Sequence, residues 1–282
     1  MNKVMRALAV PLALGLILTA CGKKTTPPAA SGTSASSNPC SPAPVKSSGV
    51  LTVAAEYPYY APFLIGKQDA PTGFEADLIN GIAQKLTGGQ VKWVNIAFDQ
   101  LYAPGPKQWD VGVSEITITP ERDQAIDFSA PYFDANQGIL VRADSKYASA
   151  TSTDQLLDAK FGAEAGTTGL DYVNQHVKPQ KKVSQFDTTD VTAQALKTGT
   201  IDIQVIDVPI AVGIIQGSKV PLKLIGEFIT DEKYGLAMEE GSPLKTCVDS
   251  AIEELKSSGV LEASQVKYFP GSTPLTEFKP TV

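Results

Sequence analysis

Residues 114–122 read Ser-Glu-Ile-Thr-Ile-Thr-Pro-Glu-Arg, and residues 127–132 follow as Asp-Phe-Ser-Ala-Pro-Tyr. The first stretch begins as a β-rich run that ends in threonines. Pro120 suits the first position of a helix, and Arg122 then lies in its first turn. Hydroxyls, free backbone N–H groups and a planar guanidinium therefore meet at one point, which predicts a site for a small carboxylate. The alternatives are that Thr119 only caps the helix and that Arg122 is a surface cation.

Short apolar runs alternate with helical periods along the rest of the chain. We expect strands at 50–55, 91–96, 110–117, 138–142, 160–165, 183–186, 201–206, 222–227 and 234–238. We expect helices at 74–86 and 192–197, a short helix after a capping box of Ser152 and Gln155, and a helix from the turn at 166–169 through 177. Two further helices are expected, one after Pro209 and one from an N-cap at Ser242 to 258. This alternation predicts an α/β fold with mostly parallel sheets, built as two βα series of similar size.

Polar clusters lie where several of these strands end. Besides the threonines before Arg122, they are the turn Gly-Thr-Thr-Gly at 166–169 and Asp207. Ligands of open α/β sheets bind at the carboxyl ends of strands. The N–H groups of the turn at 166–169 can cradle an anion, although the turn lacks the lysine of a nucleotide-binding P-loop. Asp207 can accept an ammonium group or can simply cap the next helix.

An aromatic segment follows the first expected strand. Tyr57, Tyr59 and Tyr60 lie in it, and Phe98 follows the second strand. Such rings can flank an aliphatic ligand or stack on a cation. Core packing is the alternative for each of them.

Length and charge limit the function further. A chain of 282 residues is long enough for about two domains. Its net charge of −6 argues against a nucleic-acid partner. The only histidine is His176, no Ser-His-Asp set is evident, and no cluster has metal-ligand spacing. We therefore expect no enzyme activity, no metal and no cofactor.

The N-terminus has the pattern of a signal peptide, which we assign to residues 1–20. Lys3 and Arg6 precede an apolar stretch at 7–20. The end of this stretch, Leu-Thr-Ala-Cys21, resembles a bacterial lipobox, and the resemblance implies cleavage before Cys21 and lipidation of its sulfur. We expect an extracytoplasmic protein held on the cell membrane by this lipid alone, and plain secretion is the alternative.

Residues 21–48 are expected to form a flexible tether, because they are rich in Ser, Pro, Thr and Ala and lack aromatic residues. If Cys21 carries lipid, Cys40 and Cys247 remain as a pair in an oxidising compartment. This favours a disulfide between them, and two free thiols are the alternative.

Residues 117–122 and 127–132 together resemble bacterial extracellular solute-binding proteins of family 3, and Gly-Phe-Glu-Ala-Asp-Leu at 73–78 supports the resemblance. These proteins are the polar-amino-acid receptors of ABC importers. The resemblance covers about 49–269 and implies a two-lobed periplasmic-binding-protein fold of type II. Lobe 1 would comprise 49–133 and 232–282, and lobe 2 would comprise 134–231. Two strands near 132–136 and 230–234 would cross between the lobes, which would close by hinge motion.

The resemblance also implies roles for single residues. Arg122 would clamp the ligand α-carboxylate with help from Thr117 and from the turn at Thr167 and Thr168. Asp207 would take the α-ammonium group.

At the side-chain end, Tyr60 and Phe98 fall where the family places rings. Three positions depart from the family. Glu115 replaces a glycine of many members, Glu164 replaces a lysine of some, and Tyr57, with Glu56 beside it, takes the place of an aspartate.

Charge counting suggests the ligand. Once Arg122 and Asp207 are paired with a zwitterion, Glu115 and Glu164 are left as unpaired carboxylates in a closed cleft, which is unfavourable. We therefore expect a basic amino acid such as arginine. A neutral polar amino acid is the alternative if a glutamate faces solvent or assists Asp207.

The resulting function is capture of an amino acid by a monomer that delivers it to an ABC permease and its ATPase. Two alternatives belong to other classes. One is a dehydratase-type enzyme on the same scaffold, in which a pocket glutamate acts as general acid. The other is a receptor domain that reports ligand to a sensor.

Overall fold

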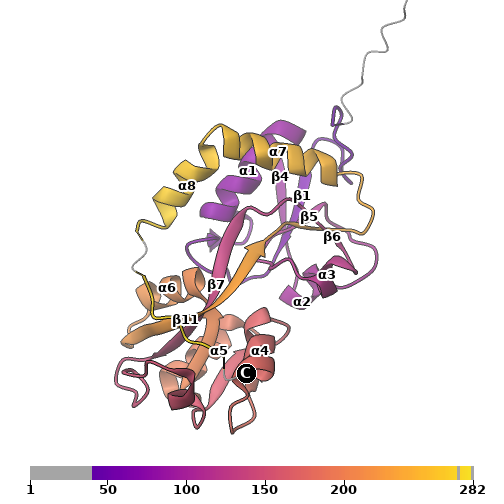
Figure 1. Ribbon diagram of the computed structural model, residues 1–282. Coiled ribbons are helices and arrows are strands. Elements are labelled where there is room, and N and C mark those ends of the chain that lie inside the picture. Colours follow the sequence, from indigo (N-terminus) through magenta and orange to yellow (C-terminus); the bar gives the residue numbers. More distant parts are fainter. Residues whose placement is uncertain (1–39, 272–273, 281–282) are drawn as a thin grey trace, which may run out of the picture. The chain divides into compact units, whose positions relative to one another are not determined.

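The computed structural model describes residues 40–271 and 274–280. Two five-stranded sheets organise these residues (Figure 1). We call the first sheet with its helices lobe 1 and the second sheet with its helices lobe 2. The expected signal peptide, Cys21 and most of the expected tether lie outside the described residues.

Lobe 1 is built on a sheet with the strand order β4-β1-β5-β12-β6. Its strands are β1 (Leu51–Ala55), β4 (Val91–Asn95), β5 (Val111–Gly112), β6 (Asp127–Phe128) and β12 (Ala237–Met238), with a separate hairpin of β2 (Ile65–Lys67) and β3 (Ala70–Thr72). Its helices are α1 (Phe74–Thr87), α2 (Phe98–Leu101), α3 (Pro120–Asp123), α7 (Lys245–Ser257) and α8 (Val260–Tyr268). Leu78 and Ile82 lie on the buried stripe of α1, which packs against β1 and α7.

Lobe 2 is built on a sheet with the strand order β11-β7-β10-β8-β9. Its strands are β7 (Phe133–Arg142), β8 (Phe161–Glu164), β9 (Ser184–Phe186), β10 (Ile203–Asp207) and β11 (Leu222–Tyr234). Its helices are η1 (Thr153–Leu156), α4 (Thr168–Tyr172), η2 (Val173–Val177), α5 (Thr189–Thr198) and α6 (Val208–Gly217). Both sheets mix parallel and antiparallel pairs rather than being mostly parallel, because β12 runs against the other strands of the first sheet and β7 runs against the other strands of the second.

Two paired strands connect the lobes, as the family resemblance implies. β7 begins beside lobe 1 and β11 returns to it, and the two run antiparallel with Phe133 opposite Tyr234 and Ala135 opposite Glu232 (Figure 1). The rings of Phe133 and Tyr234 stack with centroids 5.7 Å apart. Phe63 packs edge-on against both rings. This aromatic cluster places the first residue of β7 and the last residue of β11 in the core of lobe 1.

The C-terminal segment packs on lobe 2. Its Phe278 is buried in the same cluster as Phe161 and Phe228, and the backbone N–H of Phe278 donates to the carbonyl of Glu227. The sequence division grouped all of 232–282 with lobe 1, whereas these contacts place 276–278 against β11. The position of the other lobe boundaries stays a prediction.

Cys40 and Cys247 form a disulfide, with their Cα atoms 5.5 Å apart. Cys247 lies in the first turn of α7 and is buried. The bridge therefore joins the beginning of the described chain to a late helix of lobe 1, as the pairing of the cysteines predicts.

Four local predictions need correction. The strand expected at 110–117 is limited to Val111–Gly112, and the positive φ of 49° at Glu115 excludes an extended strand through that position. The strand expected at 222–227 continues to Tyr234. Leu244, not Ser242, is the N-cap of α7. The side chain of Ser152 makes no capping bond, and the side chain of Gln155 accepts the N–H of Thr151 rather than that of Ser152.

Helix α8 follows α7 directly and was not expected. Gly259 has a left-handed backbone with φ of 75° and serves as the N-cap of α8, so it turns the chain rather than ending the helical region. None of the helices in residues 40–271 and 274–280 has both the length and the hydrophobicity of a membrane-spanning segment.

Candidate functional site

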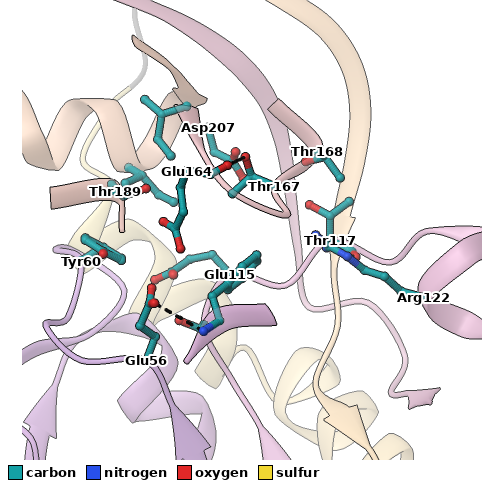
Figure 2. A pocket seen from close by; sticks show the side chains of 14 residues that line it. Glu56, Tyr60, Glu115, Thr117, Arg122, Glu164, Thr167, Thr168, Thr189 and Asp207 are labelled. Carbon is teal, nitrogen blue, oxygen red and sulfur yellow. Dashed lines mark hydrogen bonds between the residues drawn. The ribbon is translucent and has the colours of Figure 1, made fainter. Parts of the chain in front are cut away.

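A small pocket lies between the two lobes and is walled mostly by polar side chains (Figure 2). Its cavity volume is about 30 Å³. Its lining residues are Glu56, Tyr60, Phe98, Ser114, Glu115, Thr117, Arg122, Glu164, Thr167, Thr168, Thr189, Ile206, Asp207 and Ile210. Every residue predicted to touch ligand, with the exception of Tyr57, therefore lies at this one pocket.

Tyr57 lies outside the pocket and is 42% exposed. Its ring packs edge-on against Tyr59, with centroids 5.2 Å apart. Neighbouring residues of an extended chain point in opposite directions, so only one of the pair after β1 can face the cleft. That residue is Glu56, which is 5% exposed and replaces Tyr57 in the site.

Three carboxyl groups gather at one end of the pocket. Glu56 and Glu115 come from lobe 1, and Glu164 points toward them from the end of β8 in lobe 2 (Figure 2). Burial raises the pKa of Glu56 to about 7, against a weak opposing hydrogen bond from the N–H of Phe98. Burial and the charge of Glu56 raise the pKa of Glu164 to about 8. Buried carboxyl groups that crowd together without a neighbouring cation favour the binding of a cation between them.

Glu115 is the most unusual member of this group. Burial and the neighbouring Glu75 raise its pKa well above the ordinary value. Its Oε1 is buried and has no hydrogen-bond partner among the described residues. A left-handed backbone is unfavourable for a residue with a Cβ, and a glycine adopts it readily. The chain therefore carries a carboxylate at a position whose backbone suits glycine.

Arg122 spans the cleft at the other side of the pocket. Its Nη1 donates to the carbonyl of Thr117 at 2.7 Å, and its Nη2 donates to the carbonyl of Gly166 at 2.9 Å. The guanidinium lies 4.2 Å from the ring centroid of Tyr102 and 5.5 Å from that of Phe98. Burial lowers the pKa of Arg122 from its usual value. The side chain is therefore a buried cation and not a surface one, and among the described residues it is the only arginine that lines the pocket.

Threonines cap the two short helices next to Arg122, α3 and α4. The Oγ1 of Thr119 accepts the N–H of Arg122 at 3.2 Å, so Thr119 is the expected N-cap of α3. Thr167 caps α4 and donates its hydroxyl to the carbonyl of Glu164 at 2.8 Å. Thr117 and Thr168 both direct their hydroxyls at the carboxylate of Glu232.

Asp207 ends β10 and faces the pocket from lobe 2. Gln137 donates to its Oδ1 at 2.6 Å, and the hydroxyl of Tyr234 donates to its Oδ2. It occupies the N-cap position of α6 without a side-chain capping bond, so its carboxylate is not used as a cap. Burial, followed by the charge of Glu232, raises its pKa to about 7. These properties suit a group that receives an ammonium ion.

Sequence reasoning missed several contributors. Ser114, Thr189, Ile206 and Ile210 line the pocket. Ser114 and Ile206 directly precede Glu115 and Asp207 in the sequence, so the prediction of those two site residues could have been extended to their neighbours. Thr189 is the first residue of α5 and belongs to no motif that the sequence analysis identified. His176 contacts Tyr172 away from this pocket. Among residues 40–271 and 274–280, no group of His, Cys, Asp and Glu is arranged to hold a metal ion.

Residues 51–271 match the family of bacterial extracellular solute-binding proteins, family 3. The chain belongs to this family. The match spans both lobes and includes every residue of the pocket.

Known proteins of the same kind bind amino acids. The chain is 29% identical over 228 residues to the L-cystine-binding protein TcyJ of Escherichia coli K12, covering 80% of this chain and 84% of TcyJ. It is similar to an ancestral arginine-binding protein bound to glutamine, with a TM-score of 0.72, 32% identity, and coverage of 80% of this chain and 100% of the other. It is also similar to the arginine-, lysine-, histidine-binding protein ArtJ of Geobacillus stearothermophilus, with a TM-score of 0.69, 29% identity, and coverage of 79% and 96%.

Proposed function

We propose that this family 3 protein captures a basic amino acid, with arginine as the preferred ligand, and delivers it to an ABC permease. The observation that carries the proposal is the group of Glu56, Glu115 and Glu164 at one end of the pocket. Three buried carboxyl groups without a lysine or arginine among them make a strong site for a cation.

The ligand would lie along the line from Arg122 to these carboxyl groups. Its α-carboxylate would meet Arg122, Thr117 and Thr168, and its α-ammonium group would meet Asp207. A guanidinium at the far end can donate to two or more of the carboxylates at once, since it has five N–H groups in a fixed plane.

Charge balance supports a basic ligand over a neutral one. Among the described residues, four carboxyl groups and one guanidinium line the pocket. The α-carboxylate of any amino acid offsets Arg122, and its ammonium offsets one carboxylate. A basic side chain adds a second cation, whereas a neutral side chain leaves three carboxyl groups unpaired or protonated. The name of ArtJ, an arginine-, lysine-, histidine-binding protein, is in line with this preference. Cystine, named for TcyJ, also carries a second ammonium group, but its second carboxylate would face Glu56 and Glu164.

Entry of the ligand requires the lobes to separate. A cavity of about 30 Å³ has room for one or two water molecules. Contacts such as the hydrogen bond from the hydroxyl of Tyr102 to the carbonyl of Gly166, at 2.9 Å, join the two lobes across the cleft. Opening and closing would bend the crossing strands β7 and β11, as in other hinged binding proteins.

We further propose that the chain acts outside the cytoplasm on a lipid attached to Cys21. The apolar stretch at 7–20 and the Leu-Thr-Ala-Cys21 sequence support this. The disulfide between Cys40 and Cys247 suits an oxidising compartment. The relatives described above are named for binding, and we propose binding without a chemical step for this chain.

The experiment that tests the function is a thermal-shift panel of the twenty amino acids together with cystine, ornithine and citrulline. A ligand that binds only the folded protein raises its melting temperature. We expect arginine, lysine or ornithine to give the largest shift. If glutamate or aspartate gave the largest shift, the charge argument would be contradicted. If cystine gave the largest shift, the proposed ligand would change from a basic amino acid to one with two ammonium and two carboxylate groups.

A further inference from the structure

Glu232 lies near the end of β11, and its carboxylate joins side chains of the two lobes. Its Oε2 accepts the hydroxyl of Thr117 at 2.6 Å and the hydroxyl of Thr168 at 2.7 Å. Its Oε1 accepts Nε2 of Gln137 at 3.0 Å. Thr117 belongs to lobe 1, and Thr168 begins α4 in lobe 2. One carboxylate therefore bridges the cleft.

The two hydroxyls are the ones assigned above to the α-carboxylate of the ligand. A threonine hydroxyl has a single hydrogen, and an ionised carboxylate has none. In each of these two bonds the threonine is therefore the donor, and its hydrogen points at Glu232. Neither Thr117 nor Thr168 can donate to a second carboxylate at the same time. The ligand and Glu232 need the same two donors.

The guanidinium of Arg122 also has hydrogen-bond partners within the protein, next to the two threonines. Its Nη1 and Nη2 donate to the carbonyls of Thr117 and Gly166, one from each lobe. Gly166 lies in the same turn as Thr168, and the charge of Glu232 acts favourably on the guanidinium. The hydroxyls of Thr117 and Thr168 and the guanidinium of Arg122, the groups assigned to the ligand carboxylate, therefore already have hydrogen-bond partners within the protein.

The backbone before Glu232 is shaped to aim this side chain. The register between β11 and β7 shifts between Phe228 and Glu232, and Asp231 has a positive φ of 51°. Asn136 of β7 accepts the N–H groups of Thr230 and Asp231 at 3.0 and 3.1 Å, which secures the irregular turn. Bulges of this kind redirect side chains next to binding sites.

We propose that Glu232 is an internal carboxylate that stands in for the carboxylate of the ligand and latches the two lobes together. An amino acid binds only after Glu232 releases Thr117 and Thr168. The competition with ligand rests on the function proposed above, whereas the latch does not. Because only molecules with free hydroxyls are competent, the latch lowers the apparent affinity of the protein for its ligand.

The test compares Glu232→Ala with Asp231→Asn, a neighbouring change that also removes one negative charge but touches neither threonine. Asparagine tolerates the left-handed backbone of position 231. Calorimetry with L-arginine gives the Kd, and small-angle scattering of the ligand-free protein gives its radius of gyration. Glu232→Gln is the third variant, since its amide oxygen keeps the shape and accepts the hydroxyls more weakly.

We expect Glu232→Ala to bind arginine roughly tenfold more tightly, because charge-assisted hydrogen bonds to the threonines no longer compete. We also expect its ligand-free radius of gyration to exceed that of the wild type. Glu232→Gln should change both in the same direction by less, and Asp231→Asn should change neither.

Weaker or unchanged binding of arginine by Glu232→Ala would overturn the competition, since Glu232 would then position the threonines or receive the ammonium group. An unchanged ligand-free radius of gyration would overturn the latch. If neither the wild type nor any variant bound an amino acid, the proposed function would fail, and the ligand-free scattering would still decide whether Glu232 holds the lobes together.

Discussion

The backbone N–H of Glu115 donates a hydrogen bond of 2.9 Å to Oε1 of Glu75, and the hydroxyl of Tyr132 donates to the same oxygen. Glu75 is fully buried in the first turn of α1. A carboxyl group of the core thus fixes the left-handed backbone that presents Glu115 to the pocket. This contact links the stretch at 73–78 with the stretches at 114–122 and 127–132.

Glu75→Ala is expected to destabilise the protein by about 2–4 kcal/mol, because it leaves two buried donors without an acceptor. Glu75→Gln is the matched control, since its amide oxygen can accept from both Glu115 and Tyr132. Denaturant unfolding of the two variants measures the difference. Equal stability of the alanine and glutamine variants would show that this oxygen does not anchor the turn.

Glu115→Gly is expected to increase stability by about 1 kcal/mol, because glycine adopts the left-handed backbone without strain. The same variant should lose most of its preference for arginine over citrulline, since one of the three carboxyl groups is gone. Glu115→Gln separates the two effects, because it keeps the strain and removes the charge. Retention of the full preference by both variants would exclude Glu115 from the cation site.

The affinity for arginine is expected to rise with pH. Burial raises the pKa of Glu56 to about 7 and that of Glu164 to about 8 in the protein alone. A bound guanidinium favours the ionised carboxylates and lowers both pKa values, so binding releases protons. The Kd should therefore fall between about pH 5.5 and about pH 8. Calorimetry in buffers of different ionisation enthalpy measures the released protons, and proton uptake would contradict the cation site.

The stability of the ligand-free protein is expected to change with pH in the opposite sense. Asp207, Glu56 and Glu164 have pKa values of about 7, 7 and 8, above those of the unfolded chain. The folded state therefore holds protons that the unfolded state has lost, and the stability that these groups contribute is present below their ordinary pKa and lost as pH rises through about 7–8. Glu164→Gln should reduce this loss, which melting temperatures at about pH 5.5 and about pH 8.5 would detect. An equal pH dependence in wild type and variant would contradict the assignment of the raised pKa.

Arg122→Ala is expected to abolish the thermal shift for every amino acid, because it removes the cation that meets the common α-carboxylate. Arg142→Ala is the control, since Arg142 pairs with Asp144 at the surface of lobe 2. A thermal shift that survives in Arg122→Ala would show that another group holds the ligand carboxylate.

The parts of the fold that sequence could predict are those encoded by local chemistry. Pro120 after Thr119 marked the start of α3. Apolar periods located α1 and the buried β10. At the site, signals of the same local kind indicated Arg122 and the threonine turns, because a helix start and its cap are encoded within a few residues.

The remainder depends on contacts between distant segments. The role of Glu232 follows from a bulge in β11 that no local pattern announces. The choice of Glu56 over Tyr57 follows from the direction in which the chain leaves β1. The three-residue strands β2 and β3 are too short and exposed for a periodic signal, and β3 contains a proline. In each case the conformation is decided by residues that are distant in sequence and become neighbours only in the folded protein.

The most direct test of the central claim is calorimetry of the wild-type protein with L-arginine and L-citrulline. Citrulline has nearly the same shape as arginine and lacks its charge, so the comparison isolates the cation site formed by Glu56, Glu115 and Glu164. We predict that arginine binds about 100-fold more tightly, as expected for charge-assisted hydrogen bonds to buried carboxylates. Equal affinity for the two ligands, or tighter binding of citrulline, would contradict the account.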